Sequence, residues 1–287
     1  MTITNSTPML RQYHELKQQH PGTLLFFRLG DFYELFFEDA VIGARELQIT
    51  LTARHKERGD AVPMCGVPHH SAASYIARLV RRGFRVAICE QTEDASKTKK
   101  LVRREVVRIV TPGTPIDPQL LEARESVFLA AVCSAGETVG AAFLDISTGE
   151  FRATQEVGAS AWEKVRAHLE SYAPRELLFP ASLTPLINSG LSAKSQTAPL
   201  PLSAKANSED ESVENSQATF TCSQDNNRLL DATLTPLDDW LWQSEECATL
   251  LQDQFGVRSL EGYGLKGKHE AIRAAGACLR YARETQR

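Results

Sequence analysis

Hydrophobic and polar residues alternate most clearly between Leu24 and Phe37, a stretch that holds five of the twelve phenylalanines of the chain. Alternation on each side of Gly30-Asp31 predicts two strands joined by a turn. Side chains of a strand point to its two faces in turn. We therefore expect one face to carry Phe32, Glu34 and Phe36, and the other, the core face, to carry Tyr33, Leu35 and Phe37.

Helical and strand patterns surround this stretch and predict a small mixed α/β domain. A helix is predicted to begin at Thr7-Pro8, with Thr7 as N-cap, and to stop at Pro21-Gly22. A second helix is expected over 38–47, with Ala40, Val41, Ala44 and Leu47 inward, and a third, capped by Ser71, up to Arg82. Strands are expected over 49–52, 84–90 and 102–110. The segment 63–68, bounded by two prolines, is not expected to be a central strand.

A second domain is predicted after a Pro- and Gly-rich signal at 111–118. The predicted limits are 1–113 for the first domain, 114–125 for a linker and 126–262 for the second domain. Strands over 128–133, 139–145 and 150–154, a helix over 159–172 and a strand over 176–179 follow the order of a ribonuclease H-like α/β fold. Residues 190–220 are predicted to be a mobile insertion because they are rich in Ser, Ala, Asn and Glu. Helical patterns over 237–255 and 268–285 end the chain, and the last one has no stop signal, which suggests a fragment of a longer protein.

Composition narrows the class of protein. Residues 1–115 hold 17 Lys and Arg against 12 Asp and Glu, a net charge of +5, whereas residues 116–287 hold 15 against 24, a net charge of −9. Only the first domain is therefore expected to meet a polyanion. No secretory signal or membrane-spanning run is visible, and six scattered cysteines fit a reducing, cytoplasmic location. Cys65, His69 and His70 lack a second ligand pair, so no metal site is predicted.

Glu34 is the first candidate for chemistry, because a carboxylate flanked by aromatic residues is seldom buried without a partner. An aromatic side chain can wedge between stacked bases, and a carboxylate two residues on can hydrogen-bond to what the wedge displaces. The alternative is an ordinary half-buried strand with a solvated glutamate.

Two other patterns suggest enzymes and are weaker. Residues Gly262–Lys268 match the GxxxxGK phosphate-loop pattern, but His269 replaces the required Ser or Thr and no buried strand precedes it. We expect a glycine-rich hinge there. Asp145, at the end of a predicted strand, could belong to a ribonuclease H-like nuclease, although two-metal chemistry needs several converging carboxylates. A solvated aspartate at a strand end is the simpler interpretation.

Several motifs together resemble the start of the MutS family of bacterial DNA mismatch repair proteins, and the resemblance covers nearly the whole chain outside 190–220. The motifs are Thr7-Pro-Met9, Phe26-Phe-Arg-Leu-Gly-Asp-Phe-Tyr-Glu-Leu-Phe36, Pro63-Met-Cys-Gly-Val-Pro-His-His70, Val86-Ala-Ile-Cys-Glu-Gln91, Val107-Arg-Ile-Val-Thr-Pro-Gly-Thr114, Leu144-Asp-Ile-Ser-Thr-Gly-Glu150 and Ala274-Ala-Gly-Ala-Cys-Leu-Arg-Tyr-Ala282.

The resemblance implies a mismatch-recognition domain, a ribonuclease H-like connector domain and, at 263–287, the first helix of an all-α core domain. It also implies that Phe32 wedges into a mispair in duplex DNA and that Glu34 hydrogen-bonds to the displaced base. Arg54 and the loop holding Met64 and His70 resemble parts that touch the minor groove and the backbone. Where the family usually has Tyr before this histidine, the chain has His69. Backbone contacts are further expected from Arg103, Arg104 and Arg108.

The resemblance also implies what lies outside this chain. The ATPase domain of the family, with its ATP and magnesium sites and most of its homodimer contact, would follow residue 287, so neither a cofactor nor catalysis is expected within these residues. The connector domain is the expected docking surface for MutL. Besides a mismatch-binding module, two alternatives stay open: a nuclease centred on Asp145, and a protein-interaction scaffold.

Overall fold

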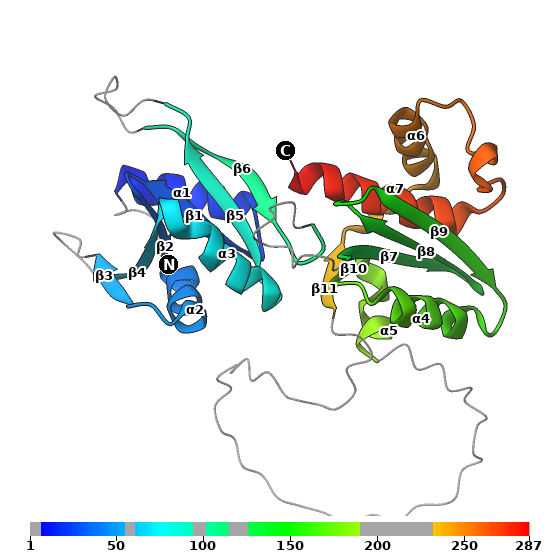
Figure 1. Cartoon of the computed structure of the whole chain (residues 1–287), viewed down its shortest axis with the longest axis horizontal. Helices are drawn as coiled ribbons and strands as arrows, with labels where there is room; N and C mark the ends of the chain where they lie inside the picture. The colour runs from blue at the N-terminus through cyan, green and yellow to red at the C-terminus, as the bar shows by residue number, and fades with distance from the viewer. Residues whose placement is uncertain (1–6, 55–60, 94–101, 115–125, 190–231, 287) are drawn as a thin grey trace, which may run out of the picture.

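The computed structural model describes residues 7–54, 61–93, 102–114, 126–189 and 232–286. Two sheets, each with helices on both faces, form the two halves of the structure (Figure 1). The architecture is mixed α/β, as the hydrophobic pattern predicts. The predicted insertion at 190–220 and most of the predicted linker lie outside the described residues.

The first sheet has six strands in the order β3-β4-β2-β1-β5-β6. The β1 and β2 strands form the predicted hairpin, β1 pairs in parallel with β5, and the other neighbours pair antiparallel. The strands are β1 (Thr23–Leu29), β2 (Phe32–Phe36), β3 (Thr52–Arg54), β4 (Val62–Pro68), β5 (Arg85–Gln91) and β6 (Arg104–Val110). Helix α1 (Pro8–Gln19) covers one face of this sheet, and helices α2 (Phe37–Leu47) and α3 (Ala72–Arg81) cover the other.

Helix α1 begins as predicted, because the Thr7 hydroxyl accepts a hydrogen bond from the backbone N–H of Leu10. Its Tyr13 donates to Asp39 (3.0 Å), which also accepts from Lys17 (2.7 Å) and from the backbone N–H of Leu25 (3.0 Å). This buried carboxylate therefore joins α1, α2 and β1, and its partners offset the cost of burying its charge.

Several local predictions in this half are wrong. Phe37 is not on the core face of a strand: it starts α2 with φ 55° and is 39% exposed. Val41 is exposed as well, because α2 turns it away from the sheet. Strand β3 forms at 52–54, not 49–52. The Ser71 hydroxyl donates to the Pro68 carbonyl and does not cap α3, which follows a short 3-10 turn, His69–Ser71.

Segment 63–68 is a central strand, contrary to prediction. Strand β4 lies between β3 and β2, but Pro63 faces only the three-residue β3, and Pro68 ends the pairing with β2. Both prolines thus occupy the ends of the strand, where a missing N–H disrupts little of the hydrogen-bond ladder.

The second sheet has the order β11-β10-β7-β8-β9. Strands β7 (Phe128–Ala135), β8 (Thr138–Asp145) and β9 (Glu150–Val157) form the predicted antiparallel meander, and β10 (Glu176–Pro180) adds to β7 in parallel. This confirms the ribonuclease H-like order, with β11 (Thr233–Leu237) as a parallel strand that the sequence did not predict. Helix α4 (Ala161–Tyr172) and the short α5 (Thr184–Asn188) cover one face.

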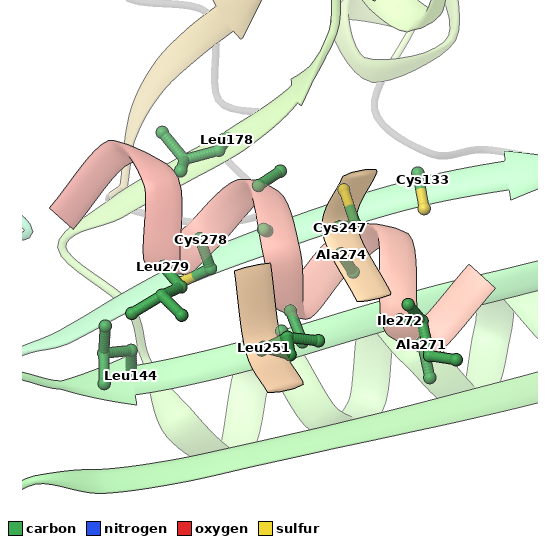
Figure 2. Close-up of a cluster of buried hydrophobic side chains, with 14 of the residues drawn as sticks. Cys133, Leu144, Leu178, Cys247, Leu251, Ala271, Ile272, Ala274, Cys278 and Leu279 are labelled. Carbon is green, nitrogen blue, oxygen red and sulfur yellow. The ribbon is translucent and has the colours of Figure 1, made fainter. Parts of the chain in front are cut away.

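Helix α7 (His269–Thr285) covers the other face of this sheet, with α6 (Ser244–Phe255) against it. Figure 2 shows α7 lying along the strands, with Leu144 and Leu178 of the sheet and Leu251 of α6 pointing into the shared cluster. A Cβ on Gly140 of β8 would lie 2.2 Å from the backbone of Glu270, so this glycine permits the close approach of α7. The predicted domain limits stay predictions, but the terminal helix shares the core of the second sheet. The predicted helix at 237–255 begins only at Ser244, after a 3-10 turn over Asp239–Trp242.

Candidate functional site

Phe32 is an exposed aromatic side chain on a hairpin whose other aromatic residues are buried. Gly30 takes φ 58° in the turn, a conformation that glycine adopts without strain, and Phe32 is the first residue of β2. Phe32 is 46% exposed, whereas Phe36, on the same face of the strand, is fully buried against Tyr13 of α1. The face predicted for Phe32, Glu34 and Phe36 therefore exists, covered by α1 at one end and open at the other.

Glu34 lies between these two positions and is half-buried. Its carboxylate is 3.6 Å from the Arg54 guanidinium, and its Oε2 atom, although buried, has no hydrogen-bond partner. Burial raises the pKa of Glu34, and the positive charge of Arg54 opposes that shift only in part. The protein thus holds a carboxyl group with an unused hydrogen-bonding atom and an increased tendency to be protonated.

Gly66 pairs with Glu34 across β2 and β4, and the sequence analysis did not single it out. A Cβ at this position would lie 3.2 Å from the Tyr33 carbonyl and 3.4 Å from Cγ of Glu34. The missing side chain leaves space beside the carboxylate. A glycine inside an otherwise alternating strand is the signal that could have found it.

Of the loop residues predicted with Phe32, His70 and its neighbour His69 lie at the same end of the sheet, and Met64 lies at the other end. Pro68 pairs with Phe32, and the backbone N–H of His69 donates to the Asp31 carbonyl (2.8 Å), which ties the His69–Ser71 turn to the hairpin. The imidazoles of His69 and His70 are both exposed, with ring centroids 6.0 Å apart. Met64 is half-buried on the α1 side, opposite Phe36.

Arg103, just before β6, and Arg104 and Arg108, on β6, do not join this site. Strand β6 is separated from β2 by β1 and β5. Arg103 is exposed and paired with Glu105 (2.6 Å), and Arg108 is half-buried, with no partner for Nε or Nη2. Arg104 is the least accessible of the three: it is buried, its guanidinium lies 4.9 Å from the centre of the Phe27 ring, and it donates to the Arg28 carbonyl (2.7 Å). These contacts do not favour a role for Arg104 at the DNA backbone, which stays a prediction.

Asp145 is not part of a cluster of potential metal-binding side chains among the described residues. Its Oδ1 accepts from the Ser147 hydroxyl (2.6 Å) and backbone N–H (2.9 Å), which fixes the turn between β8 and β9. Within the described residues, no three His, Cys, Asp or Glu side chains come together in a way that could hold a metal ion. Cys65 is buried in the α2–α3 cluster and donates to the Ala40 carbonyl, away from the exposed His69 and His70.

The phosphate-loop pattern falls on a connection between helices. Residues 244–268 are all described, and they form α6, a short turn over Glu261–Tyr263 and a loop into α7. No strand precedes Gly262 in this segment, so the arrangement is a glycine-containing connection between helices.

Comparison with known proteins defines the class. Residues 7–119 match the family model of MutS domain I, and residues 127–287 match MutS domain II. The chain belongs to the MutS family.

Individual relatives are similar in sequence over nearly the whole chain. A protein of Solibacter usitatus named DNA mismatch repair protein MutS is 48% identical over 98% of the chain. Proteins of the same name from Myxococcus xanthus and Syntrophomonas wolfei are 43% and 42% identical over 99% of it. The chain spans 28–29% of the length of these relatives. Among the described residues, no helix is long and apolar enough to cross a membrane.

Proposed function

We propose that this chain recognises mispaired or unpaired bases in duplex DNA during mismatch repair, with Phe32 as a stacking wedge and Glu34 as the hydrogen-bonding partner of the displaced base. The observation that carries the proposal is the pair itself: an exposed aromatic ring beside a half-buried carboxyl group, one oxygen of which lies 3.6 Å from Arg54 but makes no hydrogen bond. The names of the relatives support the same role.

The wedge selects its target through the energy of unstacking. Inserting a ring between bases costs a few kcal/mol, least where the pair is already mismatched. Bending at such a weakened step also costs less. Selectivity therefore does not require contacts that distinguish one base sequence from another. Affinity that depends on salt would come from phosphate contacts made by Arg54, and by Arg103 and Arg108 at the far edge of the sheet.

Glu34 adds a penalty against normal pairs. Burial already raises the pKa of this carboxyl, and the negative potential of DNA acts in the same direction. When protonated, the group donates a hydrogen bond to an acceptor on the displaced base. At a normal pair no base is displaced, and the carboxyl is left without a partner against the phosphates.

In the whole protein, we propose further, these residues act with a homodimeric ATPase, and the second sheet provides the surface that MutL binds. ATP and magnesium would act outside this chain, in the cytoplasm. A mismatch-binding module is preferred to a nuclease because Asp145 has no nearby carboxylates that complete a metal site among the described residues.

The test is binding of one mismatched and one matched duplex, at fixed salt, by full-length protein containing this chain. Phe32→Ala should weaken binding to the mispair by roughly ten- to a hundredfold, since base–aromatic stacking contributes about 1–3 kcal/mol. Matched-duplex binding should change little. Phe255→Ala, which removes another partly exposed ring on α6, is the control and should change neither affinity. Equal weakening on both duplexes would show that Phe32 supports the fold or general DNA binding and is not a mismatch wedge, and equal wild-type affinities would favour the scaffold alternative.

Glu34 variants separate the carboxyl's two effects in the same assay. Glu34→Ala removes a charge that phosphates repel, so it should tighten matched-duplex binding and reduce discrimination. Glu34→Gln keeps a donor and should retain more mismatch preference than Ala. If both variants discriminate as well as wild type, Glu34 has no role in selection.

A further inference from the structure

The segment Thr111–Thr114 opens the Pro- and Gly-rich signal that precedes the predicted linker at 114–125, yet all four of its residues are buried. It leaves β6 of the first sheet and is held against the second sheet. The Thr111 and Thr114 hydroxyls hydrogen-bond to each other (2.8 Å), and Gln286 at the end of α7 donates to the Thr114 carbonyl (2.8 Å). The exit of the first domain is therefore a docked part of the structure.

Glu176, the first residue of β10, is the centre of this contact. Its side chain is fully buried. Each carboxylate oxygen accepts two hydrogen bonds, and the donors to one oxygen come from a different half of the structure than the donors to the other. Oε2 accepts from the Thr111 hydroxyl (2.6 Å) and the Gly113 backbone N–H (3.0 Å), both on the exit segment. Oε1 accepts from Thr235 of β11 (2.7 Å) and Tyr281 of α7 (2.6 Å), both in the second half.

The surroundings make this carboxylate difficult to replace. A Cβ on Gly113 would lie 2.8 Å from Cβ of Glu176, so only glycine allows the exit segment to come this close. Burial and the charge of Glu176 raise the pKa of Tyr281 well above its usual value, so the phenol stays a donor near neutral pH. Across the same boundary, the Arg85 guanidinium of β5 lies 5.8 Å from the centre of the Tyr281 ring.

We propose that Glu176 is the positioning residue that fixes the sheet bearing Phe32 relative to the second sheet. A buried carboxylate is stable only while its hydrogen bonds are made, and losing one side leaves charge unpaired in the interior. Because one oxygen is satisfied from each half, the free energy of keeping this charge buried depends on the two halves staying together. The inference goes beyond the wedge and rests on these contacts alone, so it would survive if Phe32 proved not to touch DNA.

Two isosteric variants of the 287-residue chain form a matched test. Thr111→Val removes a donor from the exit segment, and Thr235→Val removes one from the second half, each from the same carboxylate. Thr111→Val should speed hydrogen exchange of the Gly113 amide by about ten- to a hundredfold, the effect of losing a hydrogen bond to a charged group, and should increase the radius of gyration in solution scattering. Thr235→Val should destabilise the second half to urea but leave the radius of gyration unchanged.

Rescue completes the test. Thr111→Ser restores the hydroxyl and should return both the Gly113 exchange rate and the radius of gyration to wild-type values. The inference is overturned if Thr111→Val and Thr235→Val change Gly113 exchange equally, or if Thr111→Val lowers stability without altering the radius of gyration. Glu176 would then be a structural residue of the second half.

Discussion

At the scale of single residues, strand alternation predicted the face of Phe32 and Glu34 but not its exposure. Exposure depends on where α1 ends over the sheet, and the sequence does not specify that position. Phe37 shows a case in which alternation misled: it fitted the strand pattern, but α2 begins at Phe37, one residue before the predicted start at 38, and Phe37 takes a left-handed φ. Such a φ is strained for a bulky side chain and cannot be read from hydrophobicity.

Glu34→Gln should reveal that Glu34 is retained at a cost in stability. Because burial raises the folded pKa, the native state binds more protons than the unfolded state between the ordinary value, about 4.3, and the raised value. Wild-type stability should therefore fall, relative to the variant, as pH rises through that window. Above it the cost is fully present, and Glu34→Gln should be at least as stable as wild type.

Urea unfolding of both chains from about pH 4 to 7 measures this difference. Glu38→Gln, an exposed carboxyl at the start of α2, is the control and should show no such trend. A Glu34→Gln chain that is less stable than wild type at pH 7 would show that the Arg54 pair outweighs burial.

At the scale of elements, most helices and strands could be predicted, because hydrophobic periodicity, the Thr7-Pro8 start and the Gly30-Asp31 turn are local signals. The failures have non-local causes. Strand β4 is central because its prolines fall at the ends of pairing, which depends on the lengths of β3 and β2. Strand β11 forms because β10 offers it an edge. The same holds for the candidate site. Phe32 and Glu34 could be predicted because they belong to a local motif, whereas the burial of Arg104 could not, because it depends on contact with Phe27 of β1.

Gly140→Ala should loosen the terminal helix. A Cβ there would meet the Glu270 backbone at 2.2 Å, so α7 or β8 must shift, and overpacking of this kind costs about 1–3 kcal/mol. Gly262→Ala is the control, because nothing lies within 4 Å of the added carbon. Removing backbone freedom from the unfolded chain should make that variant neutral or slightly more stable. Urea denaturation compares the two, and equal stabilities would mean that α7 does not press on β8 at Gly140.

At the scale of the whole molecule, charge is divided between the halves, +5 for residues 1–115 and −9 for the remainder. In the proposed complex, an acidic second half would repel DNA, so affinity would depend on how the basic half is oriented toward the duplex, and the docked segment at Thr111–Thr114 would fix that orientation. The basic side chains are themselves scattered: Arg54 lies on β3 near one edge of the first sheet, and Arg103 and Arg108 lie at the other, beside or within β6.

Arg54→Ala tests which edge meets the phosphates. Its side chain is 50% exposed and only 3.6 Å from Glu34, so in the proposed complex it stands beside the wedge. Each phosphate contact contributes about −0.9 to the slope of log affinity against log salt for duplex DNA. Arg54→Ala in the full-length protein should therefore flatten this slope by about one and weaken matched and mismatched duplexes alike. Arg45→Ala is the matched control, because that arginine is 72% exposed but lies on α2, which covers the opposite face of the sheet, and is paired with Glu46. If both variants flatten the slope equally, the general charge of the first half governs binding, and Arg54 makes no specific phosphate contact.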